Sequence, residues 1–287
     1  MFGPLAGILF DGFAYGMLLF LLSVGLSVTL GMMNFINLAH CSFGMLGGYV
    51  TVTLMEHAGF PFLAALPMAF LAAALASIVI ERLLFRRMYR ASDLDQCLVT
   101  IGVVFMSVAG AAYVWGTVQQ PVRLPEWLTG SVDILGATLS AYRLFLIGTA
   151  IVVTLALVAA LEWTRFGAQV RAAVDNQRMA RGLGLDVDRT FSLTFALGSG
   201  LAGLGGALAI GMLGLEPGFA FAYLIYVLIV VSVGGLATIG GSFVAAALLG
   251  IIDMAGKYYV PGLGSFLIYL VMVGLLVWKP AGLFGKR

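Results

Sequence analysis

The chain has 287 residues, of which 62% are hydrophobic and 10% are charged, and its mean hydropathy is +1.08. A water-soluble domain of this length could not keep so apolar a surface in water, so the composition excludes a soluble globular protein and indicates a polytopic membrane protein. The formal net charge of +2 gives no sign of nucleic-acid binding, because the arginines and lysines lie in short loops between apolar segments. Cys41 and Cys97 lie in or beside apolar runs without CxxC spacing, which predicts neither a disulfide nor a metal site.

The apolar segments set the expected fold. The opening stretch MFGPLAGILFDGF lacks a basic n-region and a signal cleavage site, so we expect a retained first span. A membrane-spanning helix needs about 20 mostly apolar residues. Nine segments meet or nearly meet this requirement, namely 7–30, 37–57, 61–80, 97–116, 141–161, 190–214, 221–237, 242–257 and 264–279. Because glycines punctuate the region 221–257, broken or re-entrant helices there would leave eight crossings. We predict an all-α integral membrane protein, a polytopic helical bundle of about eight or nine transmembrane segments that forms one domain over residues 1–287.

Small residues recur at helical spacing within these segments. GxxxG pairs begin at Gly12 and Gly44, and a stripe of glycine and alanine surrounds Gly198. Helices in lipid gain no hydrophobic drive from associating, so small residues that let backbones approach are expected at their contacts. The pattern predicts a tightly packed bundle and says little about a substrate.

The basic residues indicate which ends of the helices face the cytoplasm. Four arginines lie in residues 81–96, five lie in residues 162–189, and three basic residues lie in the tail KPAGLFGKR. With nine crossings, these twelve of the fifteen basic residues fall on one side, which the positive-inside rule places in the cytoplasm. The N-terminus is then external and the C-terminus internal.

The largest external segment is the loop 117–140. Its two prolines and Trp127 favour a short structured cap at the membrane interface, serving either as an inert connector or as a docking surface. Near the outer end of another segment, Asp253 and Lys257 are spaced i, i+4 and are expected to pair in a structural role.

The stretch GMMNFINLAHCSFGMLGGYV, residues 31–50, is a candidate for the translocation path. Polar side chains are costly in hydrocarbon unless they are satisfied, so they should face the bundle interior or a water-filled path. The interrupted apolar run also predicts a helix broken near mid-membrane, which exposes backbone groups to a solute. The candidate path residues here are Asn34, Asn37, His40, Cys41 and Ser42. The alternative is that Asn37 and His40 only cap and cross-link helices.

A second candidate is the glycine-rich stretch VGGLATIGGS, which contains Gly234, Gly235, Gly240 and Gly241. It interrupts an apolar run at a position that mirrors residues 31–48 from the other end of the chain. Paired interruptions of this kind indicate an inverted repeat around a central path. A tight turn between two helices explains the same glycines.

The basic loop 162–189 is a candidate contact for a motor that the chain does not contain. The sequence has no GxxxxGK[ST] nucleotide loop and no HExxH or GxSxG catalytic motif, so we expect a transport subunit without its own nucleotide site, not an enzyme. Within the loop, residues 171–184 predict a short amphipathic helix whose apolar face holds Ala172, Met179 and Leu183. Such a helix can dock into a groove of a partner or rest on the anionic leaflet.

Four passages carry a resemblance to a known family. INLAHCSFGMLGGYV, RAAVDNQRMARGLGLDVDR, VGGLATIGGSFVAAALLGI and KPAGLFGKR occur in the order found in Liv-type permeases of branched-chain amino-acid ABC importers. The second passage resembles the ATPase-coupling segment, a variant of the EAA loop of ABC importers. The chain departs from the family at Cys41, where members usually have glycine, and this departure bears on the shape of the pore and on the identity of the solute.

The resemblance implies a function and a set of partners. The chain would form the path for branched-chain or related amino acids together with a second permease subunit, expected as a heterodimer, in the bacterial inner membrane. An external or periplasmic solute-binding protein would deliver the solute, and two cytoplasmic ATPases would use ATP and Mg²⁺, so that this chain binds no cofactor. The implied coupling residues are Arg171, Ala172, Asp175, Asn176, Ala180, Gly184 and Leu185. A urea, amide or aromatic-acid importer of the same class, a stand-alone secondary transporter and a membrane scaffold are the competing interpretations.

Overall fold

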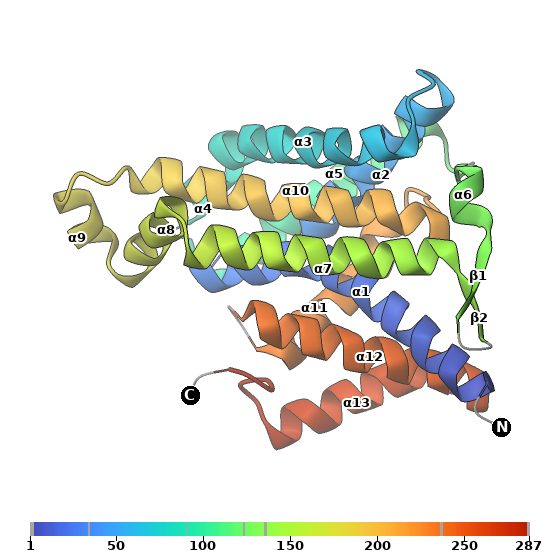
Figure 1. Cartoon of the computed structure of the whole chain (residues 1–287). Helices are drawn as coiled ribbons and strands as arrows, with labels where there is room; N and C mark the ends of the chain where they lie inside the picture. The colour runs from blue at the N-terminus through green and yellow to red at the C-terminus, as the bar shows by residue number, and fades with distance from the viewer. Residues whose placement is uncertain are drawn as a thin grey trace.

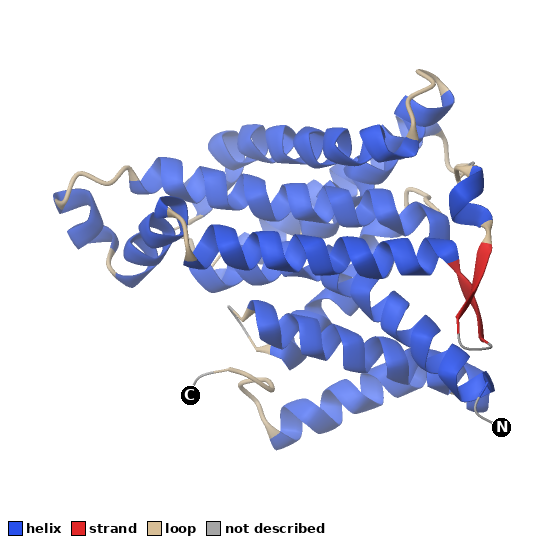
Figure 2. Ribbon diagram, viewed as in Figure 1, coloured by secondary structure: helices blue, strands red, loops and turns tan. Residues whose placement is uncertain are grey.

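A computed structural model describes residues 3–33, 35–89, 91–122, 124–134, 137–235 and 238–285. The chain is almost entirely helical, and its long helices lie side by side in one bundle (Figures 1 and 2). The main helices are α1 (Gly3–Met33), α2 (His40–Glu56), α3 (Phe62–Ile80), α5 (Asp93–Trp115), α7 (Ala141–Glu162), α10 (Val187–Leu213), α11 (Phe219–Gly234), α12 (Ile239–Tyr259) and α13 (Gly264–Trp278). Each predicted apolar segment coincides with one of these helices, which confirms the all-α polytopic fold.

The helices differ in their ability to cross a membrane. Among the described residues, six helices are long and apolar enough to do so: α1, α3 with its extension to Met88, α5, α7, α10 and α12. The helices α2, α11 and α13 have 17, 16 and 15 residues. At 1.5 Å per residue, helices of this length span about 25 Å or less, so they fall short of a full hydrocarbon core of about 30 Å unless the bilayer adapts.

Short elements join the long ones at the two ends of the bundle. At one end, α6 (Glu126–Thr129) precedes an antiparallel hairpin of β1 (Ser131–Ile134) and β2 (Ala137–Ser140), in which Ser131 lies opposite Ser140. Within the loop 117–140, the ring of Trp127 packs edge-on against Phe145 at 5.7 Å, so the loop forms a structured cap. The hairpin itself was not predicted. At the other end lie the π-helix η1 (Glu81–Phe85), α4 (Arg86–Met88), α8 (Arg165–Asp175) and α9 (Gln177–Gly182).

The two ends of the bundle differ in charge. The N-terminal residues, α6 and the hairpin lie together at one end, whereas α8, α9 and the C-terminal residues lie at the other (Figure 1). Helices α4, α8 and α9 each contain two arginines, so the end of the bundle that they form is rich in positive charge. By the positive-inside rule we assign this end to the cytoplasm. The opposite end is the outer end.

Helices α1 and α10 form the centre of the bundle. In the most apolar 18-residue stretch of each of these helices, 89% and 83% of the residues are buried. The corresponding shares are 17% in α5 and 22% in α7. The central helices meet through glycines: a Cβ atom on Gly25 would overlap the backbone of Gly198, and one on Gly206 would overlap the backbone of Gly44. The predicted small-residue contacts are thus close packing of backbones: Gly25 of α1 and Gly44 of α2 meet α10, whereas Gly12 and Gly16 of α1 meet the backbone of α12.

The bundle has the pattern of an inverted repeat. In each half a long helix (α1 or α10) leads into a non-helical stretch (35–39 or 214–218), followed by a short helix and a third helix. The long helix of each half packs on the third helix of the other half: α1 packs on α12, and α10 packs on α3. Since α1 runs from the outer end to the cytoplasmic end and α10 runs the opposite way (Figure 1), the halves are inverted.

The glycine-rich stretch VGGLATIGGS does separate two helices, as the tight-turn alternative predicted, but it is not the mirror of the first interruption. The stretch that mirrors residues 35–39 is 214–218, where Gly214 ends α10 with φ of +75°, a value that favours glycine. The glycines of VGGLATIGGS instead form the turn between α11 and α12. A Cβ atom on Gly241 would overlap the carbonyl oxygen of Gly234, so these glycines allow two helix ends to meet closely.

Candidate functional site

The non-helical segment 35–39 lies inside the bundle and leads into α2. Helix α2 begins at His40, whose Nε2 donates a hydrogen bond of 3.1 Å to the carbonyl oxygen of Leu22. Leu22 lies eleven residues before the end of α1 at Met33, a distance of about 16 Å along the helix. The chain therefore turns back from the cytoplasmic end and starts α2 near mid-membrane, which confirms the predicted broken helix.

Two side chains near the start of α2 have polar atoms without a hydrogen-bond partner in the described part of the chain. Asn37 is 1% exposed, and neither its Oδ1 nor its Nδ2 has a hydrogen-bond partner among the described residues. The same holds for Nδ1 of His40. Each unsatisfied buried polar group costs about 1–3 kcal/mol, so these atoms are unfavourable unless water or another polar group reaches them. Asn34, the first predicted path residue, lies outside the described residues.

Cys41 and Ser42 begin the first turn of α2 and are both buried. Ser42 lines a cavity of about 250 Å³ between α2, α3 and α5 and accepts a 2.7 Å hydrogen bond from Ser107. Tyr49 and Trp115 stack at 4.5 Å in the wall of this cavity. Of the predicted path residues, only Ser42 lines this cavity, which the sequence analysis missed. The signal for the cavity was Ser107, a polar residue in the middle of the apolar run 97–116.

Gln96 holds the broken segment in place. Its side chain is 3% exposed, and its Oε1 accepts a 3.0 Å hydrogen bond from the backbone N–H of Ile36. Its Nε2 donates to the carbonyl oxygens of Met88 and Ala91, each at 3.3 Å. Gln96 therefore fastens segment 35–39 to the turn between α4 and α5. The sequence analysis did not identify it, although a glutamine at the start of a span is a usable signal.

The four glycines of the other predicted path segment lie at the cytoplasmic end of α11 and α12. The C-terminal residues run along this turn, where Leu283 donates a 2.7 Å hydrogen bond to the carbonyl of Val233 and Phe284 donates one of 3.2 Å to that of Gly234. A Cβ atom on Gly235 would lie 2.5 Å from the backbone nitrogen of Gly285. Gly240 and Gly241 follow in the first turn of α12. The role of these glycines in a path stays a prediction.

The cytoplasmic loop folds as two helices, so the prediction of a single helix over 171–184 was wrong. Helix α8 ends at Asp175, and Asn176 adopts an extended conformation with φ of −152°. Its Oδ1 accepts a 2.9 Å hydrogen bond from the backbone N–H of Met179 and caps α9. Asparagine is among the best N-cap residues, because its side chain satisfies backbone donors that a continuing helix would bond itself.

The predicted apolar face was also wrong. Val170, Ala173 and Ala180 face the bundle, whereas Met179 and Leu183 are 64% and 78% exposed. Helix α8 lies so close to the end of α7 that a Cβ atom on Gly167 would overlap the backbone of Leu161. This close approach selects the Gly167 side of the helix for burial and leaves larger apolar side chains in solvent.

The predicted coupling residues divide between surface and interior. Arg171, Ala172, Asp175, Asn176 and Gly184 are exposed, Leu185 is half-buried and Ala180 is buried. Arg171, Ala172, Val174 and Asp175 line a surface hollow of about 500 Å³. The surface therefore combines a hollow, exposed apolar side chains and charges of both signs, which suits a protein partner.

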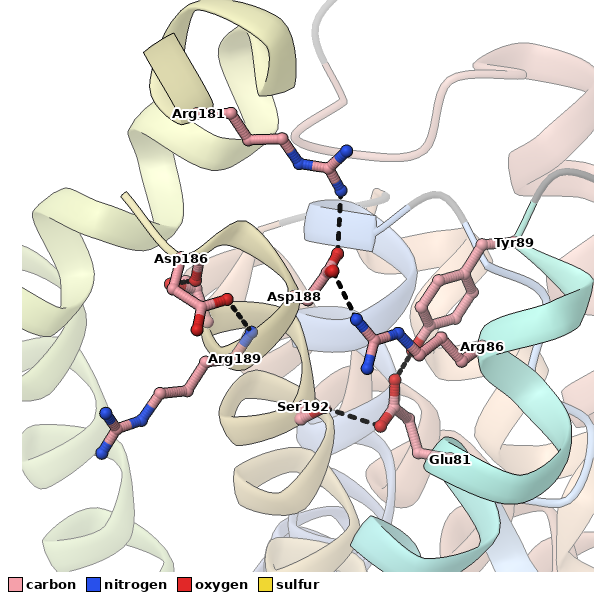
Figure 3. Close-up of polar contacts among 9 residues, drawn as sticks. Glu81, Arg86, Tyr89, Arg181, Asp186, Asp188, Arg189 and Ser192 are labelled. Carbon is pink, nitrogen blue, oxygen red and sulfur yellow. Dashed lines mark hydrogen bonds and ion pairs between the residues drawn. The ribbon is translucent and has the colours of Figure 1, made fainter. Parts of the chain in front are cut away.

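Ion pairs connect this surface to the bundle (Figure 3). The carboxylate of Asp188, at the start of α10, accepts hydrogen bonds from Arg181 at 2.8 Å and from Arg86. The guanidinium of Arg171 donates to the carbonyl of Leu161 at the end of α7. Helices α8 and α9 are thereby tied to α4, α7 and α10.

A buried carboxylate lies beneath these ion pairs. Glu81 in the π-helix η1 is 1% exposed and accepts hydrogen bonds from Ser192 at 2.6 Å and from Tyr89 at 2.7 Å (Figure 3). Burial and the hydrogen bond to Glu81 raise the pKa of Tyr89 above its usual range, so its hydroxyl keeps the proton that it donates. The contact fixes η1 against α10. In the described part of the chain, no group of three His, Cys, Asp or Glu side chains is placed to hold a metal ion.

Comparisons with known proteins place this architecture among transport proteins. The family described as branched-chain amino acid transport system, permease component, matches residues 8–276. A protein of Methanocaldococcus jannaschii named probable branched-chain amino acid transport permease protein LivH is 28% identical over 94% of this chain and 90% of its own length. The high-affinity branched-chain amino acid transport system permease proteins LivH of Escherichia coli and BraD of Pseudomonas aeruginosa are 24% and 26% identical, each over 97% of this chain and over 94% and 95% of their own lengths. No solved structure matches the chain.

Proposed function

The chain belongs to the family of permease components of branched-chain amino acid transport systems, and on that premise we propose that it is the transmembrane subunit of an ABC importer. Partner ATPases hydrolyse ATP with Mg²⁺ in the cytoplasm, and this chain contributes half of the path for a branched-chain or related amino acid. A solute-binding protein delivers the amino acid at the outer face. The assembly lies in the bacterial inner membrane.

The observation that carries the proposal is the exposed surface of α8 and α9. Solvent-exposed Met179 and Leu183 beside the hollow at Arg171 and Asp175 offer apolar contact and charge to a protein partner. The ion pairs of Asp188 then link that surface to the bundle. Force applied to α8 and α9 by a closing ATPase therefore reaches α10.

A second permease subunit accounts for the exposed apolar sides of the bundle. Leu75 on α3, Met106 on α5 and Val277 on α13 are 63%, 75% and 81% exposed. In the membrane such side chains contact lipid or another subunit. We propose a heterodimer in which the partner permease covers part of this surface and completes the path.

Transport follows from motion of α10. The cytoplasmic start of this helix is tied to α9, and its glycines pack directly on the backbone of α2 at Gly44 and Gly47. A shift of α10 therefore displaces the start of α2, where Asn37 and His40 have polar atoms without a partner among the described residues. The path alternates between faces as these atoms gain and lose contact with water and solute.

The test is a charge change on the exposed surface. Met179→Glu and Asp175→Lys, made separately in the reconstituted transporter, should lower ATPase stimulation by the liganded binding protein and amino-acid uptake at least tenfold, because they place repulsive charge at the docking surface. Asp93→Lys, a charge change at an exposed residue in the first turn of α5 at the same end of the bundle, is the matched control. If the α8 and α9 variants couple ATP hydrolysis to uptake as well as the wild type does, this surface is not the ATPase contact. Uptake competition with urea, acetamide and phenylacetate tests the competing solute classes.

A further inference from the structure

A hollow of about 600 Å³ lies among the outer ends of α1, α7, α10, α11, α12 and α13. Its volume falls within the range of roughly 300–1,000 Å³ that small-molecule sites occupy. It is lined by charged side chains from α7 and α12 and by four tyrosines from α1, α11 and α13. It is separate from the cavity beside Ser42, which lies between α2, α3 and α5.

Asp253 presents a free carboxylate oxygen. Its side chain is fully buried, at 0% exposed, and its Oδ2 accepts a 2.6 Å hydrogen bond from Nζ of Lys257. Its Oδ1 has no partner among the residues that the structure describes. A buried carboxylate oxygen is costly unless a donor satisfies it. The hollow beside it gives such a donor a place to bind.

Two cations line the same hollow. Lys257 is 45% exposed, and its ammonium group lies 5.5 Å from the centre of the Tyr15 ring while it contacts Asp253. Arg143, from the start of α7, forms an ion pair with Asp11 on α1. A guanidinium has five N–H donors and an ammonium has three, so both cations keep donors for a ligand. The hollow thus holds an anionic acceptor and cationic donors.

Apolar and aromatic groups complete the lining. Tyr226 lies between Tyr223 and Tyr269, with ring centres 6.1 Å and 6.2 Å apart. Met212 and Met254 add flexible apolar surface. An aliphatic side chain can pack against these groups, while the tyrosine hydroxyls provide further hydrogen bonds.

We propose that this hollow is an outer binding site for the zwitterionic head group of an α-amino acid with an apolar side chain. The ammonium group of the ligand pairs with Oδ1 of Asp253, and its carboxylate pairs with Arg143 and Lys257. A ligand with only one of the two charges leaves either the acid or the cations unmatched, and the site therefore discriminates against it. The proposal rests on the proposed function, and it assigns a recognition role to an ion pair that the i, i+4 spacing alone predicts as structural.

The test measures binding to the assembled transporter in nanodiscs without the solute-binding protein. Saturation-transfer NMR gives the affinities for L-leucine, for 4-methylpentanoate, which lacks the ammonium group, and for 3-methylbutylamine, which lacks the carboxylate. The wild type should bind L-leucine at least tenfold more tightly than either analogue. Asp253→Asn should bind L-leucine no more tightly than 4-methylpentanoate, because the ammonium group has lost its partner. Glu126→Gln at the outer end is the matched control and should bind as the wild type does.

A second variant guards against a folding defect. If Asp253→Asn does not assemble, Arg143→Gln should show at least a threefold smaller preference for L-leucine over 3-methylbutylamine than the wild type does, because the carboxylate keeps only Lys257 as a partner. The proposal is overturned if the wild type shows no preference for L-leucine, or if the assembled variants keep that preference. ATP-driven uptake by the wild type is measured separately. Normal uptake with unchanged binding by the variants rejects the site and leaves the proposed function, whereas Asp253-dependent binding without uptake rejects the function and leaves the site.

Discussion

Replacing Asp188 by asparagine should loosen α9 from the bundle without unfolding it. Asp188 takes part in two ion pairs, with Arg86 and with Arg181, and the side chains involved are 45–50% exposed. Exposed ion pairs of this kind contribute about 0.2–1 kcal/mol each. The variant should therefore lose at most about 2 kcal/mol of folding stability, which a thermal melt in detergent, followed by size-exclusion chromatography, will register as a small shift.

The same substitution should also lower the coupling of ATP hydrolysis to uptake. If α9 transmits force through Asp188, loss of about 0.7–1.4 kcal/mol of coupling free energy corresponds to a roughly three- to tenfold fall in uptake per ATP hydrolysed. A double-mutant cycle with Arg181→Gln isolates the connection. The losses should be non-additive, and they should shrink in high salt because exposed charges are screened. Additive losses, or unchanged uptake per ATP in Asp188→Asn, would refute the reasoning.

Three further substitutions test packing, the buried carboxylate and the broken segment. Gly206→Ala should prevent assembly of the folded protein, because the added Cβ overlaps the backbone of Gly44, and the yield of monodisperse protein measures this. Tyr89→Phe should lower the free energy of unfolding by about 1.5–3 kcal/mol, since it removes a hydrogen bond to the buried Glu81, and a thermal melt detects the loss. Asn37→Ala should leave stability unchanged or higher, because neither amide atom has a partner in the described residues, but should reduce amino-acid uptake.

Matched controls exist for the first two substitutions. No atom lies within 4 Å of a Cβ atom built on Gly102 in α5, so Gly102→Ala should yield as much folded protein as the wild type. Tyr113 is 92% exposed, and Tyr113→Phe should melt at the same temperature as the wild type. For the broken segment the opposite outcome is informative: an Asn37→Ala protein that melts early and transports normally would make Asn37 a helix cross-link instead of a path residue.

The positions of the helices along the chain could be predicted because they depend on local features, whereas the side of the membrane that each end faces stays a prediction. Uninterrupted apolar runs predict membrane helices, and the arginines of residues 81–96 and 162–189 indicate the cytoplasmic side. The broken start of α2 was also predictable, since Asn37 and His40 interrupt an apolar run. These signals need no knowledge of which helix contacts which.

The errors arose where tertiary contacts decide the outcome. In α8 and α9 the expected face contained the larger apolar residues, yet Met179 and Leu183 are exposed. The buried face instead carries Ala173 and Ala180, which pack in one cluster with residues of α10. Apolar residues on a surface that docks a partner do not mark the core. Likewise the spacing of Asp253 and Lys257 predicted their ion pair. It could not show that Arg143, more than 100 residues earlier in the sequence, lines the same hollow.

The packing of α10 decides how a displacement at α9 travels. A helix embedded in flexible side chains could absorb a small shift by changes of rotamer. The glycines of α10 leave no such layer, because Gly198 meets the backbone of Gly25 on α1 and Gly206 meets that of Gly44 on α2. A close-packed interface of this kind moves as a unit or changes to another arrangement, and it does not deform gradually. A shift of α10 must therefore move α2 or slide along it, and either motion alters the surroundings of Asn37 and His40.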